Sequence, residues 1–472
     1  MKSLPQVLGA LAALWGFAAC THIAAPLPPP VLAVAPSFAA PLPHAGNPAK
    51  LKDWWASWGD STLLELIERS QAQSPTLAAA AARIAGARAT LASVGASRWP
   101  NVSLGAHETR SGAPDMPGNF AAPTQSRGVS VDAIWELDLF GSGRQALSAA
   151  AASARADART LEWHDARVTL AADIATGYVN LRSCEILLIG FERDSQSRAE
   201  TARLIDLKAK AGFTAPAEAA LTEASAAEAR ARTTQQRASC ELEIKALATL
   251  TTFDEPTLRS KLATRRARMP VVRGWDLQRV PAAALTQRPD LAAALRELDA
   301  IASDIGVADA DRFPRITLSG ALGYVGLPDA GKTWSFGPAI SLPIFDAGRR
   351  AAAVNLAASR YAEASAHLQE RASRAVREVE EALVRLASAA AREEDTRRAQ
   401  KGFEAFATAA ESKVRVGVGS VVELEEARRA VVAAQGAAVN LERERLTAWV
   451  SLYRAVGGGW ERDQTITTIS AK

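Results

Sequence analysis

The stretch SRWPNVSL at residues 97–104 decides the fold, because it returns later in the chain as DRFPRITL at residues 311–318. In both copies an aromatic residue and a proline stand before alternating polar and apolar residues, a pattern typical of the start of a β-strand. A second pair of similar segments, SPTLAAA at 74–80 and RPDLAAA at 288–294, lies at the same distance before each copy. Matching segments at matching distances indicate an internal duplication of the chain.

Two further pairs of segments extend the duplication toward the end of each half. They are FGSGR at 140–144 with FDAGR at 345–349, and KAG at 210–212 with RVG at 415–417. The distance between the two segments is the same in both halves. The halves differ in length at residues 111–126, a glycine- and proline-rich run of the first half that we interpret as a surface loop.

Each half therefore predicts the same order of elements: a helix, two strands, a very long helix, a tight tip and a long returning helix. The expected parts are a first repeat at 53–260 with a β-hairpin at 101–139 and a tip near 212, a second repeat at 261–460 with a β-hairpin at 315–343 and a tip near 417, and a C-terminal tail at 461–472.

The long helices set the architecture. Residues 142–209 and 348–415 are rich in alanine and contain no proline, so each stretch predicts a helix of roughly 100 Å. Helices of this length cannot bury an apolar stripe inside a compact domain, and they must pack side by side in a tube or a coiled coil. A simple coiled-coil rod is an alternative, but it does not account for the two strand pairs.

The strand pairs predict that each chain contributes part of a membrane barrel. In the second pair Ile316, Leu318, Leu322 and Tyr324 alternate with small or polar residues, as in strands with one side toward lipid and the other toward a wet lumen. Half-buried strands of soluble proteins show the same alternation. Four strands cannot close a barrel, and open strand edges cannot face lipid. We therefore expect a closed ring of identical chains, in which three copies would supply twelve strands.

The N-terminus predicts export. Residues 1–19 contain a lysine, an apolar run and small residues, as in a signal peptide. Ala18-Ala19-Cys20 resembles a lipobox, the site at which bacterial lipoproteins are cleaved and acylated, although Phe17 stands where leucine is usual. We expect lipidation of Cys20 followed by an extended, proline-rich tether at 20–52. Plain cleavage that leaves Cys20 unmodified is the alternative.

The other two cysteines predict a disulfide. Cys184 and Cys240 are equally distant from Gly212, the expected tip of the first helical hairpin. Positions equidistant from a turn face each other across a hairpin, and an exported protein meets oxidising conditions. We therefore expect a Cys184–Cys240 bridge, with two unpaired buried cysteines as the alternative.

Composition argues against other function classes. The net charge is +4, without the clustered basic face and stacking aromatics of a nucleic-acid-binding protein. The five histidines are scattered and show no metal-ligand spacing, so no metal site and no cofactor is expected. No Ser/His/Asp arrangement stands out either, and we expect no catalytic residues.

Together these features resemble the TolC/OprM-type family of outer-membrane efflux proteins, in particular its NodT-like lipoprotein branch. The resemblance covers Asp53 to Trp460. Besides the repeats, its marks are WW at 54–55, WGD at 58–60, YVNLR at 178–182 and LYRAVGGGW at 452–460. It implies a mainly α fold with transmembrane β: a trimeric, twelve-stranded outer-membrane barrel that continues into a twelve-helix periplasmic α-barrel.

The resemblance also implies function and partners. The chain would be the passive outer-membrane exit duct of a tripartite efflux pump for small toxic compounds, with a periplasmic membrane-fusion adaptor at its helical tips and an inner-membrane transporter of the RND type. The alternatives are an exit duct for type I protein secretion and a structural, lipid-tethered coiled-coil protein of the periplasm.

In that family acidic residues just past the tips ring the closed periplasmic entrance. The matching residues here are Glu218, Glu423 and Glu426, although each also fits an ordinary solvated helix face. The residues matching the adaptor-contacting tips are Gly212, Phe213, Gly417 and Val418. Some members carry a basic residue where this chain has Gly419, so Lys413 or Arg415 is expected to serve as the basic partner at the entrance.

Overall fold

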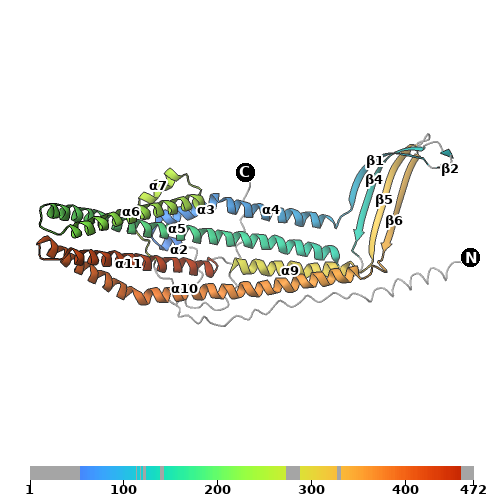
Figure 1. Cartoon of the computed structure of the whole chain (residues 1–472). Helices are drawn as coiled ribbons and strands as arrows, with labels where there is room; N and C mark the ends of the chain where they lie inside the picture. Colours follow the sequence, from blue (N-terminus) through green and yellow to red (C-terminus); the bar gives the residue numbers. More distant parts are fainter. Residues whose placement is uncertain are drawn as a thin grey trace, which may run out of the picture. The chain divides into compact units, whose positions relative to one another are not determined.

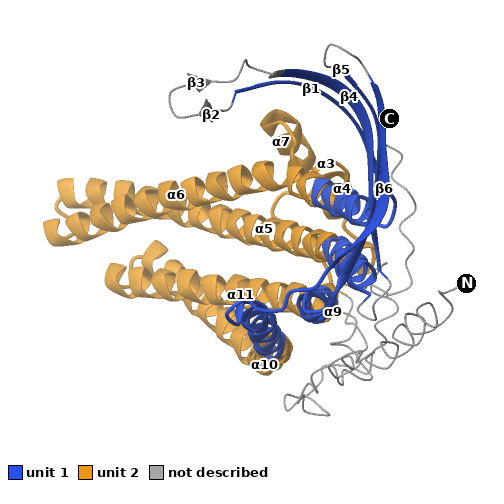
Figure 2. Cartoon of the chain, turned by 90° about the vertical axis from the view of Figure 1, so that its right-hand side faces the viewer, with its two compact units in different colours: residues 1–31, 82–160, 293–369 blue, residues 32–81, 161–292, 370–472 orange. Residues whose placement is uncertain are grey.

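The structure, a computed structural model, describes residues 54–112, 114–116, 119–120, 124–138, 143–272, 288–326 and 331–458. The expected signal peptide, Cys20 with its tether, and the tail at 461–472 lie outside the described residues. The chain divides into two compact units, drawn in different colours in Figure 2. Unit 1 comprises residues 1–31, 82–160 and 293–369, and unit 2 comprises residues 32–81, 161–292 and 370–472. Each unit thus contains segments of both repeats.

Unit 1 carries a four-stranded antiparallel sheet, whose long, curved strands lie side by side in Figure 1. Its order is β1 (Asn101–Ser111), β4 (Thr124–Leu137), β5 (Arg315–Gly326) and β6 (Gly331–Ser341). The β4–β5 pairing joins the two repeats into one sheet. Among the described residues, β1 and β6 each have a strand neighbour on one side.

The loop expected at 111–126 is partly strand. It contains two short paired strands, β2 (Pro114–Met116) and β3 (Asn119–Phe120), and β4 begins within it at Thr124. The sequence prediction missed these residues because proline, glycine and asparagine there signal turns, whereas pairing with a neighbouring strand extends the ladder past such signals.

Strand register separates two chemically different faces of the sheet. Across the four strands one row on the apolar face reads Leu104, Val131, Leu322 and Trp334. The adjacent row on the opposite face reads Ser103, Asp132, Ala321 and Ser335. The apolar row is exposed in the single chain, with Leu322 at 69% and Trp334 at 78% of their full exposure. Such an uncovered apolar face is what a lipid-facing barrel wall presents.

Helices form most of the other described residues. The two longest, α5 (Arg144–Lys210) and α10 (Arg349–Arg415), have 67 residues each, and each is followed by a returning helix, α6 (Pro216–Thr251) or α11 (Val421–Ala455). The shorter helices are α2 (Trp54–Ser57), α3 (Ser61–Gln73), α4 (Pro75–Ala96), α7 (Glu255–Ala263) and α9 (Pro289–Ala310). By length and composition the described stretch Ser61–Ala96 could cross a membrane, but its backbone leaves the helix at Ser74, between α3 and α4.

The core of unit 2 gathers segments far apart in the sequence. Trp54, Trp55 and Trp58 of the N-terminal segment are buried, and the Trp54 ring stacks on that of Tyr453 near the end of α11, with ring centroids 5.0 Å apart. The hydroxyl of Tyr178 donates a 2.8 Å hydrogen bond to Asp60. The stacking of Trp54 on Tyr453 explains why a tryptophan-rich motif stands near the start of the described chain and a tyrosine-containing motif near its end.

The two faces of the sheet predict opposite responses to a new charge. We expect Leu322→Arg to destabilise the folded protein in a bilayer by about 2–4 kcal/mol, because it places a cation against lipid. Ala321→Arg is the matched control, since it points to the opposite face, where Asp132 is the cross-strand neighbour. Urea unfolding of both variants in lipid vesicles measures the difference, and equal losses in the two variants would contradict the assignment of the faces.

Candidate functional site: the helix tips and the ion pairs behind them

The first tip joins α5 to α6 through a glycine turn. Gly212 has φ +75°, a conformation that residues with a Cβ rarely adopt. Its N–H donates to the carbonyl of Ala209 at 3.0 Å, and the N–H of Phe213 donates to that of Lys208 at 2.8 Å. These two bonds form a Schellman cap that satisfies the last carbonyls of α5. The cap leaves the Phe213 side chain 83% exposed at the very end of the hairpin.

The second tip repeats this geometry. Gly417 has φ +85°, and Val418, which is 80% exposed, donates its N–H to the carbonyl of Lys413 at 3.0 Å. Gly419 packs so tightly that a Cβ there would lie 2.7 Å from the Cβ of Lys413. A basic side chain therefore has no room at 419. Instead, Lys413 reaches Glu423, with Nζ 3.4 Å from Oε1.

Of the three predicted gate acids, Glu218 and Glu423 lie in the first turns of α6 and α11, and Glu426 follows one turn later on α11. Glu218 accepts a short hydrogen bond from the hydroxyl of Thr214, which fixes it at the start of α6. Glu423 takes the ion pair with Lys413, and Glu426 is exposed on α11. Arg415, the other expected basic partner, lies 3.7 Å from Glu411 on its own helix. Within the described chain, the contacts of Glu218 and Glu423 thus stay inside their own hairpins.

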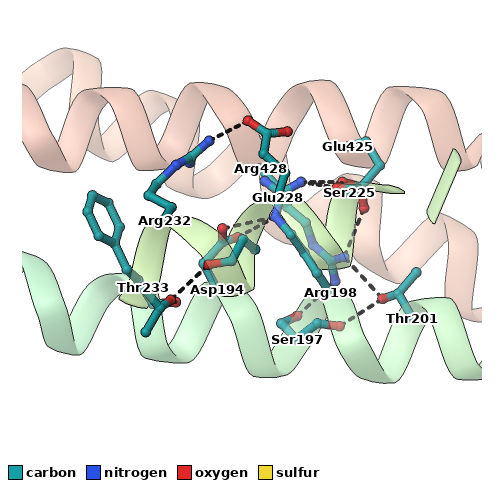
Figure 3. Close-up of polar contacts among 12 residues, drawn as sticks. Asp194, Ser197, Arg198, Thr201, Ser225, Glu228, Arg232, Thr233, Glu425 and Arg428 are labelled. Atoms are coloured by element: carbon teal, nitrogen blue, oxygen red, sulfur yellow. Dashed lines mark hydrogen bonds and ion pairs between the residues drawn. The ribbon is translucent and has the colours of Figure 1, made fainter. Parts of the chain in front are cut away.

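Behind the tips, a buried network joins α5, α6 and α11 (Figure 3). Arg198 on α5 donates from Nε to both carboxylate oxygens of Asp194, at 3.0 and 2.9 Å. Its Nη1 donates short hydrogen bonds to Ser225 on α6 and to Glu425 on α11. The side chains of Arg198 and Glu425 are each only 3% exposed, so this ion pair lies in the protein interior.

A second arginine completes the network. Arg428 on α11 donates to Glu425 at 3.2 Å, to Thr201 at 3.0 Å and to Ser197 at 2.8 Å. With Asp194 and Arg198, the group holds two cations and two anions. A buried charge is tolerated when it is paired and hydrogen-bonded, and removal of one partner leaves an uncompensated charge.

Sequence reasoning missed Arg198, Glu425 and Arg428 because it followed the acids nearest the tips. A signal was present: Val421, Leu424 and Arg428 recur at helical spacing on one face of α11, and Glu425 adjoins that stripe. Charged residues on a face that otherwise carries apolar residues indicate a buried pair, but their partners on another helix could not be identified from spacing within α11.

Covalent and polar contacts tie α5 to α6 farther from the tip. Cys184 and Cys240 form a disulfide, with their Cα atoms 5.5 Å apart. The hydroxyl of Thr233 donates to the carbonyl of Phe191 at 3.1 Å. The first hairpin is therefore held together independently of the network behind its tip.

A separate charged cluster of unit 2 surrounds Asp165 on α5. Arg288, just before α9, donates to Asp290, to Glu378 of α10 at 2.8 Å and to the carbonyl of Ala455 at 3.0 Å. Burial raises the pKa of Asp165 to about 6, and the nearby charge of Asp290 acts in the same direction. The cations of Arg288 and Arg454 oppose that rise without cancelling it, while the charge of Glu378 adds to it. Asp165 therefore titrates closer to neutrality than an ordinary aspartate.

The sequence matches a family of known proteins over most of its length. The pattern of the family described as outer membrane efflux protein matches residues 66–252 and 280–458. Nodulation protein T of Rhizobium leguminosarum bv. viciae is 26% identical over 437 residues, which cover 92% of this chain and 89% of that protein. The pyoverdine export outer membrane protein OpmQ of Pseudomonas aeruginosa is 29% identical over 437 residues, which cover 88% of this chain and 89% of that one.

The fold matches solved channel structures as well. The outer-membrane channel OprN superimposes with a TM-score of 0.78 at 28% sequence identity, covering 90% of this chain and 99% of that one. The duplicated order of helices and strands predicted from the sequence is thus the fold of a known outer-membrane channel.

The pKa of Asp165 predicts a pH-dependent stability. The folded-state pKa of about 6 lies above the ordinary value of 3.8, so Asp165 keeps its proton to a higher pH in the folded protein than in the unfolded one. The contribution of Asp165 to the free energy of unfolding therefore falls as pH rises from about 4 to about 6. We expect Asp165→Asn to remove that loss and to melt several degrees higher than the wild type at pH 7.5.

Thermal unfolding between pH 4 and pH 7.5 measures this effect. His164, whose pKa burial lowers to about 4, contributes the opposite slope, so the comparison must be between variants at each pH. Asp157→Asn, at an exposed position of the same helix, is the matched control. Parallel curves for wild type and Asp165→Asn would contradict the assignment.

Proposed function

Because this chain belongs to the outer membrane efflux protein family, we propose that three copies of it close one barrel and one helical tunnel, the exit duct of a tripartite efflux pump. The four-stranded sheet with its exposed apolar face supports the shared barrel, since unpaired strand edges cannot face lipid. Helix α4 supports the shared tunnel, because its alanine-rich surface is largely exposed in the single chain. Small side chains of this kind allow close packing against a second helix.

We infer that the duct works passively between an inner-membrane transporter of the RND type and the exterior. The exposed apolar side chains of Phe213 and Val418, at the ends of the two hairpins, are suited to contact a periplasmic adaptor. The adaptor would then bind where the hairpins have to move.

The cargo that we propose is small and organic. OpmQ is named for export of pyoverdine, and by analogy this duct would conduct small toxic compounds or drugs rather than folded proteins. The pump's selectivity would then lie in the transporter, because a duct with generic polar walls binds little.

Lipidation of Cys20 would add an anchor in the outer membrane. The residue that follows is Thr21, whereas an aspartate at that position typically retains bacterial lipoproteins at the inner membrane. The 20–52 tether would join this anchor to the described chain at Trp54.

The mass of the assembly tests the duct. We expect the detergent-purified protein, measured by light scattering with the detergent subtracted, to have about three times the chain mass of 49.8 kDa. A monomer or dimer would refute the shared barrel and favour the lipid-tethered coiled-coil alternative. In a deletion strain, loss of protein secretion without greater sensitivity to small toxic compounds would favour the type I duct.

The three predicted gate acids should make the entrance prefer cations. We expect the triple substitution of Glu218, Glu423 and Glu426 by Gln to lower the cation preference, because rings of carboxylates attract cations at a narrow pore. The reversal potential of purified protein in a planar bilayer under a KCl gradient measures this preference. Glu241→Gln, at an acid of α6 that pairs with Arg259 instead, is the control. An unchanged reversal potential in the triple variant would place the gate elsewhere.

A further inference from the structure

The buried network behind the tips consists of two halves that are each paired on their own helix. On α5, Asp194 and Arg198 form an ion pair at i and i+4. On α11, Glu425 and Arg428 form one at i and i+3. Each half therefore carries one cation and one anion, and each would remain electrically neutral without the other.

The contacts between the halves all depend on the two α11 residues. Glu425 accepts from Arg198 and Ser225, and Arg428 donates to Ser197 and Thr201. When a buried ion pair loses one partner, the remaining charge is uncompensated and the structure is strongly destabilised. Here a separation of α11 from the first hairpin would leave every charge with a carboxylate or guanidinium partner on its own helix.

The first hairpin would move as one body in such a separation. The disulfide between Cys184 and Cys240 and the 2.9 Å ion pair between Glu192 and Arg237 hold α5 against α6. The boundary that can open therefore lies between this hairpin and the N-terminal part of α11, where the contacts behind the tips are polar and non-covalent.

The network occurs once, although the chain is duplicated. In the alignment of the repeats that pairs Gly212 with Gly417, the positions equivalent to Arg198, Ser225 and Glu425 are Phe403, Ala430 and Ala220. No second ion pair can therefore form at the equivalent positions of the duplicated half. A feature present in one repeat alone points to a role in the motion of one hairpin rather than to a general requirement of the fold.

We propose that the Arg198–Glu425 contact is a reversible latch of the periplasmic entrance. It holds α11 against the first hairpin when the duct is closed. On opening, the cross-helix bonds are exchanged for the local pairs Asp194–Arg198 and Glu425–Arg428, with the hydroxyls of Ser197, Thr201 and Ser225 turning to water. This inference rests on the duct function proposed above and adds how its entrance is held shut.

The two carboxylates of the network then have opposite effects on opening. Glu425→Gln removes the charge that crosses between helices and leaves Arg198 facing Arg428, so the closed state loses stability. Asp194→Asn relieves the repulsion between Asp194 and Glu425 when closed, and on opening it would leave Arg198 without a carboxylate. We expect open probability to rise at least about tenfold in the first variant and to fall about tenfold in the second.

Single-channel recording of the full-length protein in planar phospholipid bilayers measures open probability. Glu228→Gln is the matched control, because Glu228 also pairs with an arginine in this region, but with Arg232 on the same helix α6 and in a more exposed position. We expect it to leave open probability unchanged. Ser225→Ala removes one hydrogen bond to Glu425 without changing any charge, and it should raise open probability a few-fold even if the charge variants fold poorly.

Two outcomes would overturn the latch. One is wild-type open probability in both Glu425→Gln and Ser225→Ala. The other is an equal rise in Glu425→Gln and Asp194→Asn, as expected of a purely structural ion cluster. If the proposed duct function is wrong, the result is different from either of these outcomes, because no ionic current would be seen in the wild type or in any variant.

Discussion

The structure depends first on a constraint of the backbone: inside a membrane every strand N–H and C=O must find a partner on another strand. One chain of this protein supplies four strands and leaves the outer edges of β1 and β6 to be satisfied from outside the sheet. The duplication halves the number of unpaired strand edges, because β4 of the first repeat pairs with β5 of the second. Copies of the same chain are the economical source for the rest, and ring closure follows from that requirement.

The packing of the helices is subject to a constraint of its own. Alanine-rich surfaces let long helices pack closely, but they offer little to specify which helix lies beside which. The buried ion pair between Arg198 and Glu425 adds that specificity at one place, because charges must meet their partners to be tolerated in the interior. It adds little net stability relative to an apolar contact, and this is what a contact that has to break repeatedly requires.

The sequence was sufficient for the architecture and insufficient for the contacts. Repeat spacing located both strand pairs and both tips, since the distances between turn residues are fixed by element length, and symmetry about Gly212 singled out Cys184 and Cys240. The short strands β2 and β3 were missed, because strand pairing overrode local turn signals. The partners of Glu425 were missed because they lie on α5 and α6, and single-helix periodicity carries no information about neighbouring helices.

The disulfide also bears on how the protein is made. Both cysteines belong to the first repeat, and the equivalent positions of the second are Ala389 and Arg445. A chain exported from its N-terminus presents Cys240 to the oxidising compartment before any residue of the second repeat has crossed. The first hairpin can thus be covalently closed while the remainder is still in transit. A covalently closed hairpin is then in place before the later strands and helices assemble with it.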